Sequence, residues 1–388
     1  YLKCREFLKN NRFPLLVEEN NIEAKEQEIQ EVAVLKAVAD LLHLQNIDEK
    51  KLGLSYHEMF QPFPLCRNFE ELKKVAEEHN IPEQDALLIA LNASGIRNGD
   101  IENDRGRFTI VMPDGKKYFL AMTITNKPLS PFEHRDGEIF FGSEKVAEIG
   151  EIEEDTCSDS YWRGNKTHLT LNSNSRSNCK GCEFCGTYSL RDDDKALNTP
   201  AALRRKAEEL CHEVDGDLSS LESIGVVTGC FPNEKSLVSH LQMVRSVFAE
   251  YGFNKELRYI GSQLRTKENL SLLANEGPFA LYLTVESFTR REQLMKMAKA
   301  SLNLDMGREL LKLAKEIGIE TTFLYIAGLD DIASMELEFP KYDGLLTRLP
   351  LAQTFQAYVP NQLEKRHPSA SSLNYFLKTR TIMEKSFP

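Results

Sequence analysis

The sequence predicts an α/β protein in which an N-terminal α+β domain precedes a partial (β/α)6 barrel of parallel strands. From about residue 166 onward, runs rich in apolar residues alternate with patterns of helical periodicity, which is typical of repeated βα units around a parallel sheet. Such a sheet can curl into an open barrel that gathers the loops after its strands at one rim. The 388 residues, of which 41% are hydrophobic and 28% charged, provide enough chain for two or three globular domains.

These patterns divide the chain into four parts. Residues 1–150 form the N-terminal α+β domain, and the acidic, serine-containing stretch 151–165 is a linker. Residues 166–360 form the partial barrel, and residues 361–388 form a C-terminal helical extension. The N-terminal domain contains no motif that assigns it a role.

Helices open the N-terminal domain. One apolar stripe at helical spacing consists of Val32, Leu35, Val38, Leu41 and Leu42. Asn68, with Glu71 three residues later, predicts a helix N-terminus, because an asparagine side chain can accept a hydrogen bond from the first turn. Pro82 predicts the start of the next helix, since the first helical turn tolerates a residue without a backbone N–H.

Short strands follow these helices, and the sequence predicts them at residues 107–112, 117–122, 138–141 and 145–149. The first two are joined by Pro113, Asp114 and Gly115. Proline fixes φ, aspartate bonds to its own backbone and glycine adopts positive φ, so these three residues predict a tight turn.

In the barrel, the predicted strands are residues 168–172, 223–230, 257–262, 279–286, 320–327 and 354–358. Helical patterns follow each of them except the last. Thr199 and Pro200 predict one helix start, and the buried stripe of that helix includes Cys211. Functional residues of such a barrel are expected at the C-terminal ends of its strands.

Cys179, Cys182 and Cys185 are the candidate metal ligands, because one short loop can point three closely spaced thiolates at a common centre. Structural zinc sites require a fourth ligand, and Cys157, His168, Cys211 or Cys230 could supply it. An iron–sulfur cluster held by three cysteines instead leaves one iron open to bind another molecule. Spacing alone favours zinc, but no second CxxC pair follows at the usual distance of a zinc ribbon, so the cysteines leave both interpretations open.

Cys182, Phe184 and Cys185 resemble the cluster loop of the radical S-adenosylmethionine (SAM) superfamily, whose usual pattern is CxxxCxxC with an aromatic residue before the third cysteine. Asn178 stands where the family has its first cysteine, so this loop is a CxxCxxC variant. The resemblance extends over about residues 166–360, and the segment 290–318 is loosely similar to the biotin synthase-like branch. The resemblance implies a fold related to the TIM barrel, and it implies a [4Fe–4S] cluster and SAM as the cofactors.

The resemblance also implies which residues contact SAM. Besides Phe184, which it places against the adenine, they are Gly229, Cys230, Glu286, Arg291, Lys299, Ile326 and Gly328. Residues at or near strand ends are candidates for the substrate pocket, namely Asn172, Tyr188, Arg265, Gln353, Gln356 and Tyr358. The catalytic residues are not identified by any motif.

The expected function is therefore a radical SAM enzyme. Cleavage of SAM would yield a 5′-deoxyadenosyl radical, which removes a hydrogen atom from a small-molecule substrate, in biosynthesis of a specialised metabolite or cofactor. Whether the outcome is that of a lyase, a mutase or a transferase is left open. A zinc-binding α/β protein and a non-catalytic barrel are the alternatives.

Composition limits the partners. The net charge of −11 and the absence of a dense basic block argue against nucleic acid and anionic membranes, and no apolar run is long enough to span a bilayer. Eight cysteines, three of them clustered, fit a reducing compartment, so a cytoplasmic location is expected. The family resemblance implies an electron donor such as a flavodoxin or ferredoxin.

Overall fold

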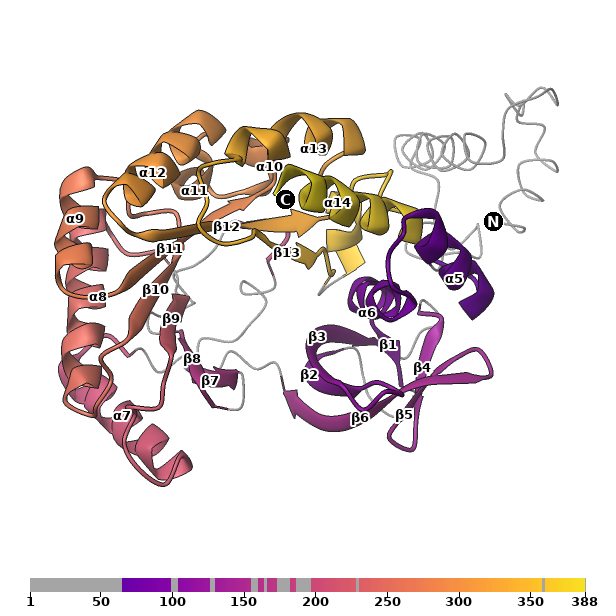
Figure 1. Ribbon diagram of the computed structural model, residues 1–388, viewed down its shortest axis with the longest axis horizontal. Helices are drawn as coiled ribbons and strands as arrows, with labels where there is room; N and C mark the ends of the chain where they lie inside the picture. Colours follow the sequence, from indigo (N-terminus) through magenta and orange to yellow (C-terminus); the bar gives the residue numbers. More distant parts are fainter. Residues whose placement is uncertain are drawn as a thin grey trace, which may run out of the picture.

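The computed structural model describes residues 65–98, 104–125, 130–154, 160–163, 166–172, 182–185, 197–227, 230–357 and 360–387. These residues form two β-sheet units, a closed barrel in the N-terminal half and a curled seven-stranded sheet in the C-terminal half (Figure 1). The predicted helix with the apolar stripe that begins at Val32 lies outside the described residues.

Two helices begin the described chain, α5 (Phe69–Glu78) and α6 (Glu83–Ser94). The Asn68 side chain accepts a hydrogen bond from the backbone N–H of Glu71 at 2.8 Å, so the predicted N-terminus of α5 is confirmed. Pro82 immediately precedes α6, as the sequence also predicted. Helix α6 packs against the barrel strand β3 (Lys117–Thr125) and thereby buries Leu87 and Leu91.

The N-terminal barrel closes in the strand order β1-β3-β2-β6-β5-β4. Besides β3, its strands are β1 (Ile96–Arg97), β2 (Asp104–Val111), β4 (Phe132–Arg135), β5 (Glu138–Phe141) and β6 (Glu144–Glu154). The predicted turn joins β2 to β3: the Asp114 carboxylate accepts from the Lys116 backbone N–H at 3.0 Å, and Gly115 has a φ of 81°. Strand β1 closes the barrel because it pairs in parallel with both β3 and β4.

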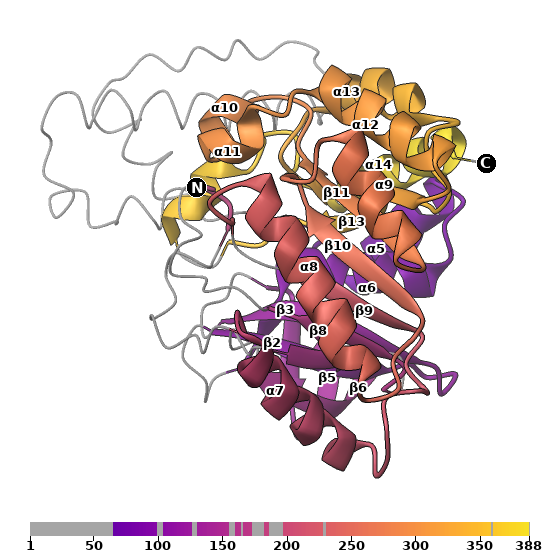
Figure 2. The ribbon, with the colours of Figure 1, turned by 90° about the vertical axis from the view of Figure 1, so that its left-hand side faces the viewer.

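The C-terminal sheet has seven strands arranged in their sequence order. They are β7 (Ser160–Arg163), β8 (His168–Leu171), β9 (Ser223–Val227), β10 (Glu256–Gly261), β11 (Phe279–Glu286), β12 (Glu320–Ala327) and β13 (Leu351–Thr354). Strands β8 to β13 pair in parallel, whereas β7 pairs antiparallel with β8. The sheet curls into a half-barrel (Figures 1 and 2).

The predicted fold class is therefore wrong, because the structure is not a partial (β/α)6 barrel built of parallel strands only. Strand β7 lies in the stretch 151–165 that was expected to be a linker, and it forms an antiparallel edge. Only the segment from Arg163 to His168 joins β7 to β8, which suits a hairpin but not the crossover of a dozen or more residues that parallel neighbours require. The N-terminal domain, predicted only as α+β, contains a closed mixed barrel.

Helices α7 (Pro200–Glu213), α8 (Glu234–Ala249), α9 (Lys267–Asn275) and α12 (Leu304–Glu316) cover the convex face of the curled sheet (Figure 2). The remaining helices are α10 (Arg291–Leu294), α11 (Met297–Ala300), α13 (Ile332–Glu338) and α14 (Leu373–Ser386), with the 3-10 turns η3 (Phe339–Tyr342) and η4 (Pro360–Lys365). Thr199 caps α7 as predicted, since its hydroxyl accepts from the Ala202 N–H at 3.2 Å. Across the described helices, none is both long and apolar enough to cross a membrane.

The two faces of the curled sheet differ in chemistry. In β10, Leu257 and Tyr259 are 0% and 2% exposed and lie on the helix-covered side. Glu256 and Arg258 alternate with them and remain partly exposed on the concave side. Strand β8 repeats this pattern, with His168 partly exposed and the following residue buried. The concave face is therefore polar, although the strands were predicted to be almost continuously apolar.

The N-terminal barrel contacts both edges of the curled sheet. At one edge, the Arg163 guanidinium of β7 lies 3.9 Å from the centre of the Phe119 ring. At the other, the Gln356 side chain, just after β13, donates a hydrogen bond to the Ala121 carbonyl at 2.8 Å. Phe119 and Ala121 both belong to β3, so one strand of the closed barrel lies across the open side of the half-barrel (Figure 1).

Candidate functional site

Two of the three predicted metal ligands, Cys182 and Cys185, lie on a tight turn beyond β8. The Cys185 N–H donates to the Cys182 carbonyl at 3.0 Å, which closes the turn. The third, Cys179, lies outside the described residues. Because β8 runs in parallel with its neighbours β9 to β12, this loop belongs to the rim formed by the C-terminal ends of those strands.

The cysteine loop is held from two sides by hydrogen bonds to its backbone. The Glu183 N–H donates to the carbonyl of Leu294, at the end of α10, at 2.8 Å. The buried Gln362 amide of η4 donates to the carbonyls of Glu183 at 3.2 Å and Cys185 at 3.1 Å. These bonds anchor the backbone of the loop at Glu183 and at Cys185, so they fix the position of the loop. The sequence analysis did not identify Gln362.

A small hydrophobic cluster surrounds this loop. We call it the rim cluster; it contains Cys182, Phe184, Leu294, Met295, Ala300, Leu329 and Phe355, with Cys185 and Ile326 packed against it. Its members come from segments that follow β8, β11, β12 and β13, so the loops of four strands meet here. Phe184 and Ile326, two predicted SAM contacts, are thus brought together. Their contact with adenine stays a prediction.

Glu286 and Lys299, also predicted to contact SAM, form a buried ion pair at the rim. The Lys299 ammonium lies 2.6 Å from Glu286 Oε1. Glu286 has a φ of 65° and follows an irregularity in the register of β11 and β12, which re-aims its side chain at the end of the strand. Its second oxygen, Oε2, is buried, and no donor in the described part of the chain bonds to it. One carboxylate oxygen is therefore left for a donor group of a ligand.

The buried Lys299 and the Cys182 thiol affect each other's pKa. Burial raises the pKa of the Cys182 thiol to about 11, against the opposing effects of Lys299 and the Lys296 backbone N–H. Burial also disfavours the charge of Lys299, but Glu286 and Cys182 outweigh it, so the pKa of Lys299 lies above its ordinary value. A thiol in this state is protonated near neutral pH and is a poor nucleophile. A metal centre that binds the thiolate displaces that proton, and Lys299 offsets part of the negative charge.

Arg291, a further predicted SAM contact, is bonded to the chain itself. Its guanidinium donates to the carbonyl oxygens of Ser287 and Leu302 at 2.9 Å each, and to that of Val285. These bonds hold the turn after β11 against the start of α12. Burial lowers the pKa of Arg291 from its usual range, as expected for a charge enclosed by neutral carbonyls.

Asp330 ties the ends of β11 and β12 together. Its buried carboxylate accepts hydrogen bonds from the backbone N–H groups of Phe288 and Thr289 at 2.8 Å each, and from the Tyr325 hydroxyl at 3.0 Å. Gly328, two residues earlier, has a φ of 114°, and a Cβ there would meet the Phe355 Cβ at 2.9 Å. The sequence resemblance placed Gly328 beside SAM; the structure shows that glycine is needed there for packing beside the rim cluster.

The predicted substrate residues occupy different places. Arg265 donates to the carbonyls of Ser262 at 2.9 Å and Ala298 at 2.7 Å. Gln356 contacts the N-terminal barrel rather than the rim, as described above. Asn172 is buried directly after β8, and Gln353 is exposed on β13. Tyr188 and Tyr358, like the predicted SAM contact Gly229, lie outside the described residues.

Of the proposed fourth ligands of a zinc site, Cys157 lies outside the described residues, and the other three are scattered. His168 lies at the N-terminal end of β8, opposite to the end that leads into the cysteine loop. Cys211 is close to Glu213, whose carbonyl accepts from the Lys166 ammonium at 2.6 Å, so it belongs to that same remote end. Cys230 alone follows a strand end, that of β9. Within the described ranges no three His, Cys, Asp or Glu side chains gather as metal ligands, and Cys179 is not among those ranges.

A scan against protein-family models and a search of curated proteins found no match for this chain. The residues of the rim are therefore the basis of the function proposed below.

Proposed function

We propose that the chain is a radical SAM enzyme that acts on a small molecule. The single observation that carries the proposal is the meeting of Cys182 and Cys185, on a loop fixed by hydrogen bonds, with the buried Lys299–Glu286 pair at the strand ends. A [4Fe–4S] cluster and SAM, when bound, would supply hydrogen-atom abstraction by a 5′-deoxyadenosyl radical. Cys182 and Cys185, with Cys179, would hold the cluster.

The residues of the rim have separate tasks in this proposal. Lys299 balances the charge of the thiolates, since its ammonium is buried beside Cys182. The unpaired Oε2 of Glu286 accepts a hydrogen bond from an ammonium group such as that of SAM. Phe184 and Ile326 offer an apolar surface that suits a flat aromatic ring and keeps water away. A flavodoxin or ferredoxin as electron donor and a cytoplasmic location belong to the same proposal.

The test is anaerobic reconstitution of the full chain with iron and sulfide, followed by dithionite and SAM. We expect 5′-deoxyadenosine, measured by mass spectrometry, from the wild type. Cys182→Ala removes a ligand and should abolish the product. Cys211→Ala is the matched control, because this cysteine lies on α7 at the remote end of the sheet and its loss should leave the product unchanged.

Two results would contradict the proposal. If the isolated protein contains about one zinc and the reconstituted protein forms no 5′-deoxyadenosine, the cysteines serve a structural metal site. If Cys182→Ala forms as much product as the wild type, the cysteine loop does not hold the reactive centre.

A further inference from the structure

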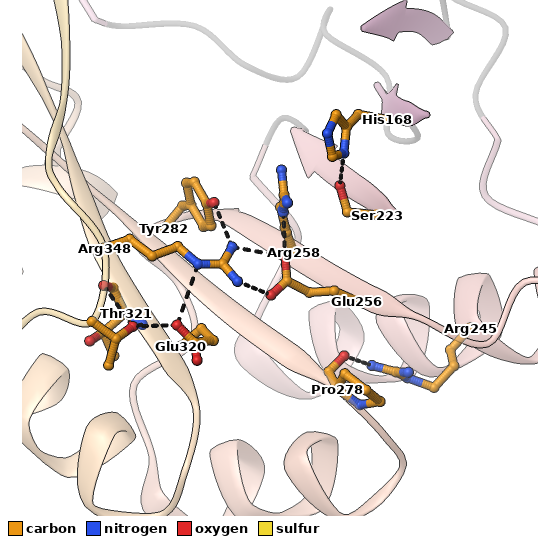
Figure 3. A network of polar contacts seen from close by, with 11 residues as sticks. His168, Ser223, Arg245, Glu256, Arg258, Pro278, Tyr282, Glu320, Thr321 and Arg348 are labelled. Carbon is orange, nitrogen blue, oxygen red and sulfur yellow. Dashed lines mark hydrogen bonds and ion pairs between the residues drawn. The ribbon is translucent and has the colours of Figure 1, made fainter. Parts of the chain in front are cut away.

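A polar network crosses the concave face of the curled sheet at the N-terminal ends of its strands (Figure 3). Arg348, in the segment before β13, donates from Nη1 to Glu256 Oε1 at 2.9 Å and from Nη2 to Glu256 Oε2. It also donates to the Tyr282 hydroxyl at 3.0 Å and pairs with Glu320 at 3.3 Å. This two-pronged contact engages both oxygens of Glu256 and fixes the carboxylate in place.

Arg258 contacts the same carboxylate through one nitrogen only. Its Nε donates to Glu256 Oε1 at 2.5 Å. Burial opposes ionisation of Glu256, but the hydrogen bonds from Arg348 and Arg258 outweigh it and lower the pKa of the carboxyl group. The Arg258 side chain is 25% exposed, and no acceptor from the described part of the chain bonds to its two terminal amino groups. Arg258 is thus held in one orientation with both terminal amino groups, which carry four N–H donors, unused.

The strands on either side of Arg258 place residues with minimal side chains beside it. In the register of the sheet, Arg258 lies level with Gly225 of β9 and Ala280 of β11, both of which have minimal side chains. An added Cβ on Gly225 would lie 3.7 Å from the Ile260 Cδ1, which is ordinary contact distance, so Ile260 borders this position. Figure 3 shows the guanidinium of Arg258 pointing away from Glu256, toward the side where His168 lies.

His168 adds a second polar group on this face. One ring nitrogen, Nδ1, shares a hydrogen bond with the Ser223 hydroxyl at 2.9 Å, while nothing in the described ranges bonds to Nε2. Burial and the charge of Arg258 lower the pKa of His168, so the imidazole is neutral at pH 7. Arg258 therefore supplies the positive charge here, and His168 supplies a neutral hydrogen-bonding group.

We propose that the two terminal amino groups of Arg258 form a binding subsite for a carboxylate or phosphate group on the concave face. The planar guanidinium matches two oxygens of either group, and its orientation by Glu256 is already established without the ligand. The assignment of the bound carboxylate or phosphate to the substrate rests on the proposed function. The binding of such a group by Arg258 does not depend on that function.

Other arginines of the chain show what a purely structural role requires. Arg291 uses its terminal groups on three carbonyls, and Arg265 uses its donors on carbonyls and the Ser301 hydroxyl. Arg258 lies on the polar face of a chain with a net charge of −11, yet its terminal groups meet no carboxylate within the described ranges. Donors that are oriented and unused are typical of a binding site.

The test is equilibrium binding to the full chain without added iron, so that it does not depend on SAM cleavage. Inorganic phosphate and acetate are titrated separately at constant ionic strength, and the shift of the thermal unfolding midpoint is measured with chloride as the reference anion. We expect at least one oxyanion to raise the midpoint in a saturable way. Phosphate and acetate together distinguish a phosphate subsite from a carboxylate subsite.

Three variants make the test specific. Arg258→Gln should weaken oxyanion binding by at least about tenfold, because a charge-assisted pair of hydrogen bonds is lost. Gly225→Val adds bulk level with Arg258 without removing a charge, and it should weaken binding in the same direction. Arg204→Gln is the control, since its guanidinium pairs with Glu250 on the helix-covered side at 2.8 Å. The affinity of Arg204→Gln for the oxyanion should equal that of the wild type.

The inference is overturned if neither oxyanion shifts the midpoint beyond the chloride reference, or if Arg258→Gln binds as tightly as Arg204→Gln. Formation of 5′-deoxyadenosine without oxyanion binding would overturn the subsite and leave the proposed function intact. Oxyanion binding that depends on Arg258, without 5′-deoxyadenosine, would support the subsite and remove the proposed function.

Discussion

The buried pair at the rim predicts a large loss of stability when its positive charge is removed. Lys299→Met keeps the length of the side chain and deletes the ammonium. Glu286, whose side chain is 11% exposed, would then carry a buried charge without a partner on either oxygen. Removal of one member of a buried pair costs about 3–5 kcal/mol, so we expect the free energy of unfolding of Lys299→Met to fall by about that amount.

A second substitution separates charge from packing. In Lys299→Met/Glu286→Gln no uncompensated charge remains, so the double variant should be more stable than Lys299→Met alone. Lys145→Met is the matched control, because this ammonium is 42% exposed and pairs with Glu138 and Glu148 at the surface of the N-terminal barrel. Its loss should change stability far less.

The measurement is urea-induced unfolding followed by circular dichroism, with all four proteins compared at one pH and ionic strength. The reasoning is refuted if Lys299→Met is destabilised no more than Lys145→Met. It is also refuted if the double variant is less stable than Lys299→Met, since the loss would then come from packing rather than from an isolated carboxylate.

Two further predictions concern the packing at Gly328 and the buried side chain of His240. Gly328→Ala places a Cβ 2.9 Å from the Phe355 Cβ, so it should lower the free energy of unfolding, measured by thermal unfolding, by about 1–3 kcal/mol. Gly344→Ala is the control, because φ is also positive there but the space is open, and it should lower the free energy of unfolding by less. Equal losses in the two variants would contradict the packing argument. His240 is buried on α8, and burial lowers its pKa to about 4. Between about pH 6.5 and pH 4 the unfolded chain therefore binds more protons than the folded chain. The free energy of unfolding should fall by about 3 kcal/mol as the pH drops through that window. His240→Leu should flatten this slope in urea unfolding measured against pH, and an unchanged slope would exclude His240 as its origin.

Local signals in the sequence predicted local structure well. Asn68 and Thr199 cap helices as expected, because each cap depends on one side chain and a nearby backbone N–H. The fold class was wrong because two strands, β1 and β7, gave no clear strand pattern in the sequence. Strand β1 has two residues and closes a barrel, and β7 forms a hairpin edge inside an acidic stretch that resembles a linker.

The candidate site was predictable in part. Glu286 and Lys299 were both expected at the rim, but only the structure shows that they pair with each other. Gln362 was not expected, since a glutamine that donates to two loop carbonyls has no pattern in sequence. Arg258 had a signal that was not used: Glu256 and Arg258 alternate with Leu257 and Tyr259, as in a strand with one polar face.

The positions of Arg258 and of the Lys299–Glu286 pair suit a substrate with an anionic end. Ala280, level with Arg258, is separated from Glu286 by the length of β11, which corresponds to about 20 Å at ~3.3 Å per residue. The Arg258 guanidinium carbon lies 5.7 Å from the centre of the Tyr282 ring, and Tyr282 is two residues nearer the rim than Ala280. Lys299 already balances Glu286 and the Cys182 sulfur. A substrate carboxylate or phosphate at the rim would add a further negative charge there, whereas at the proposed Arg258 subsite a separate guanidinium would neutralise it and would still orient the molecule.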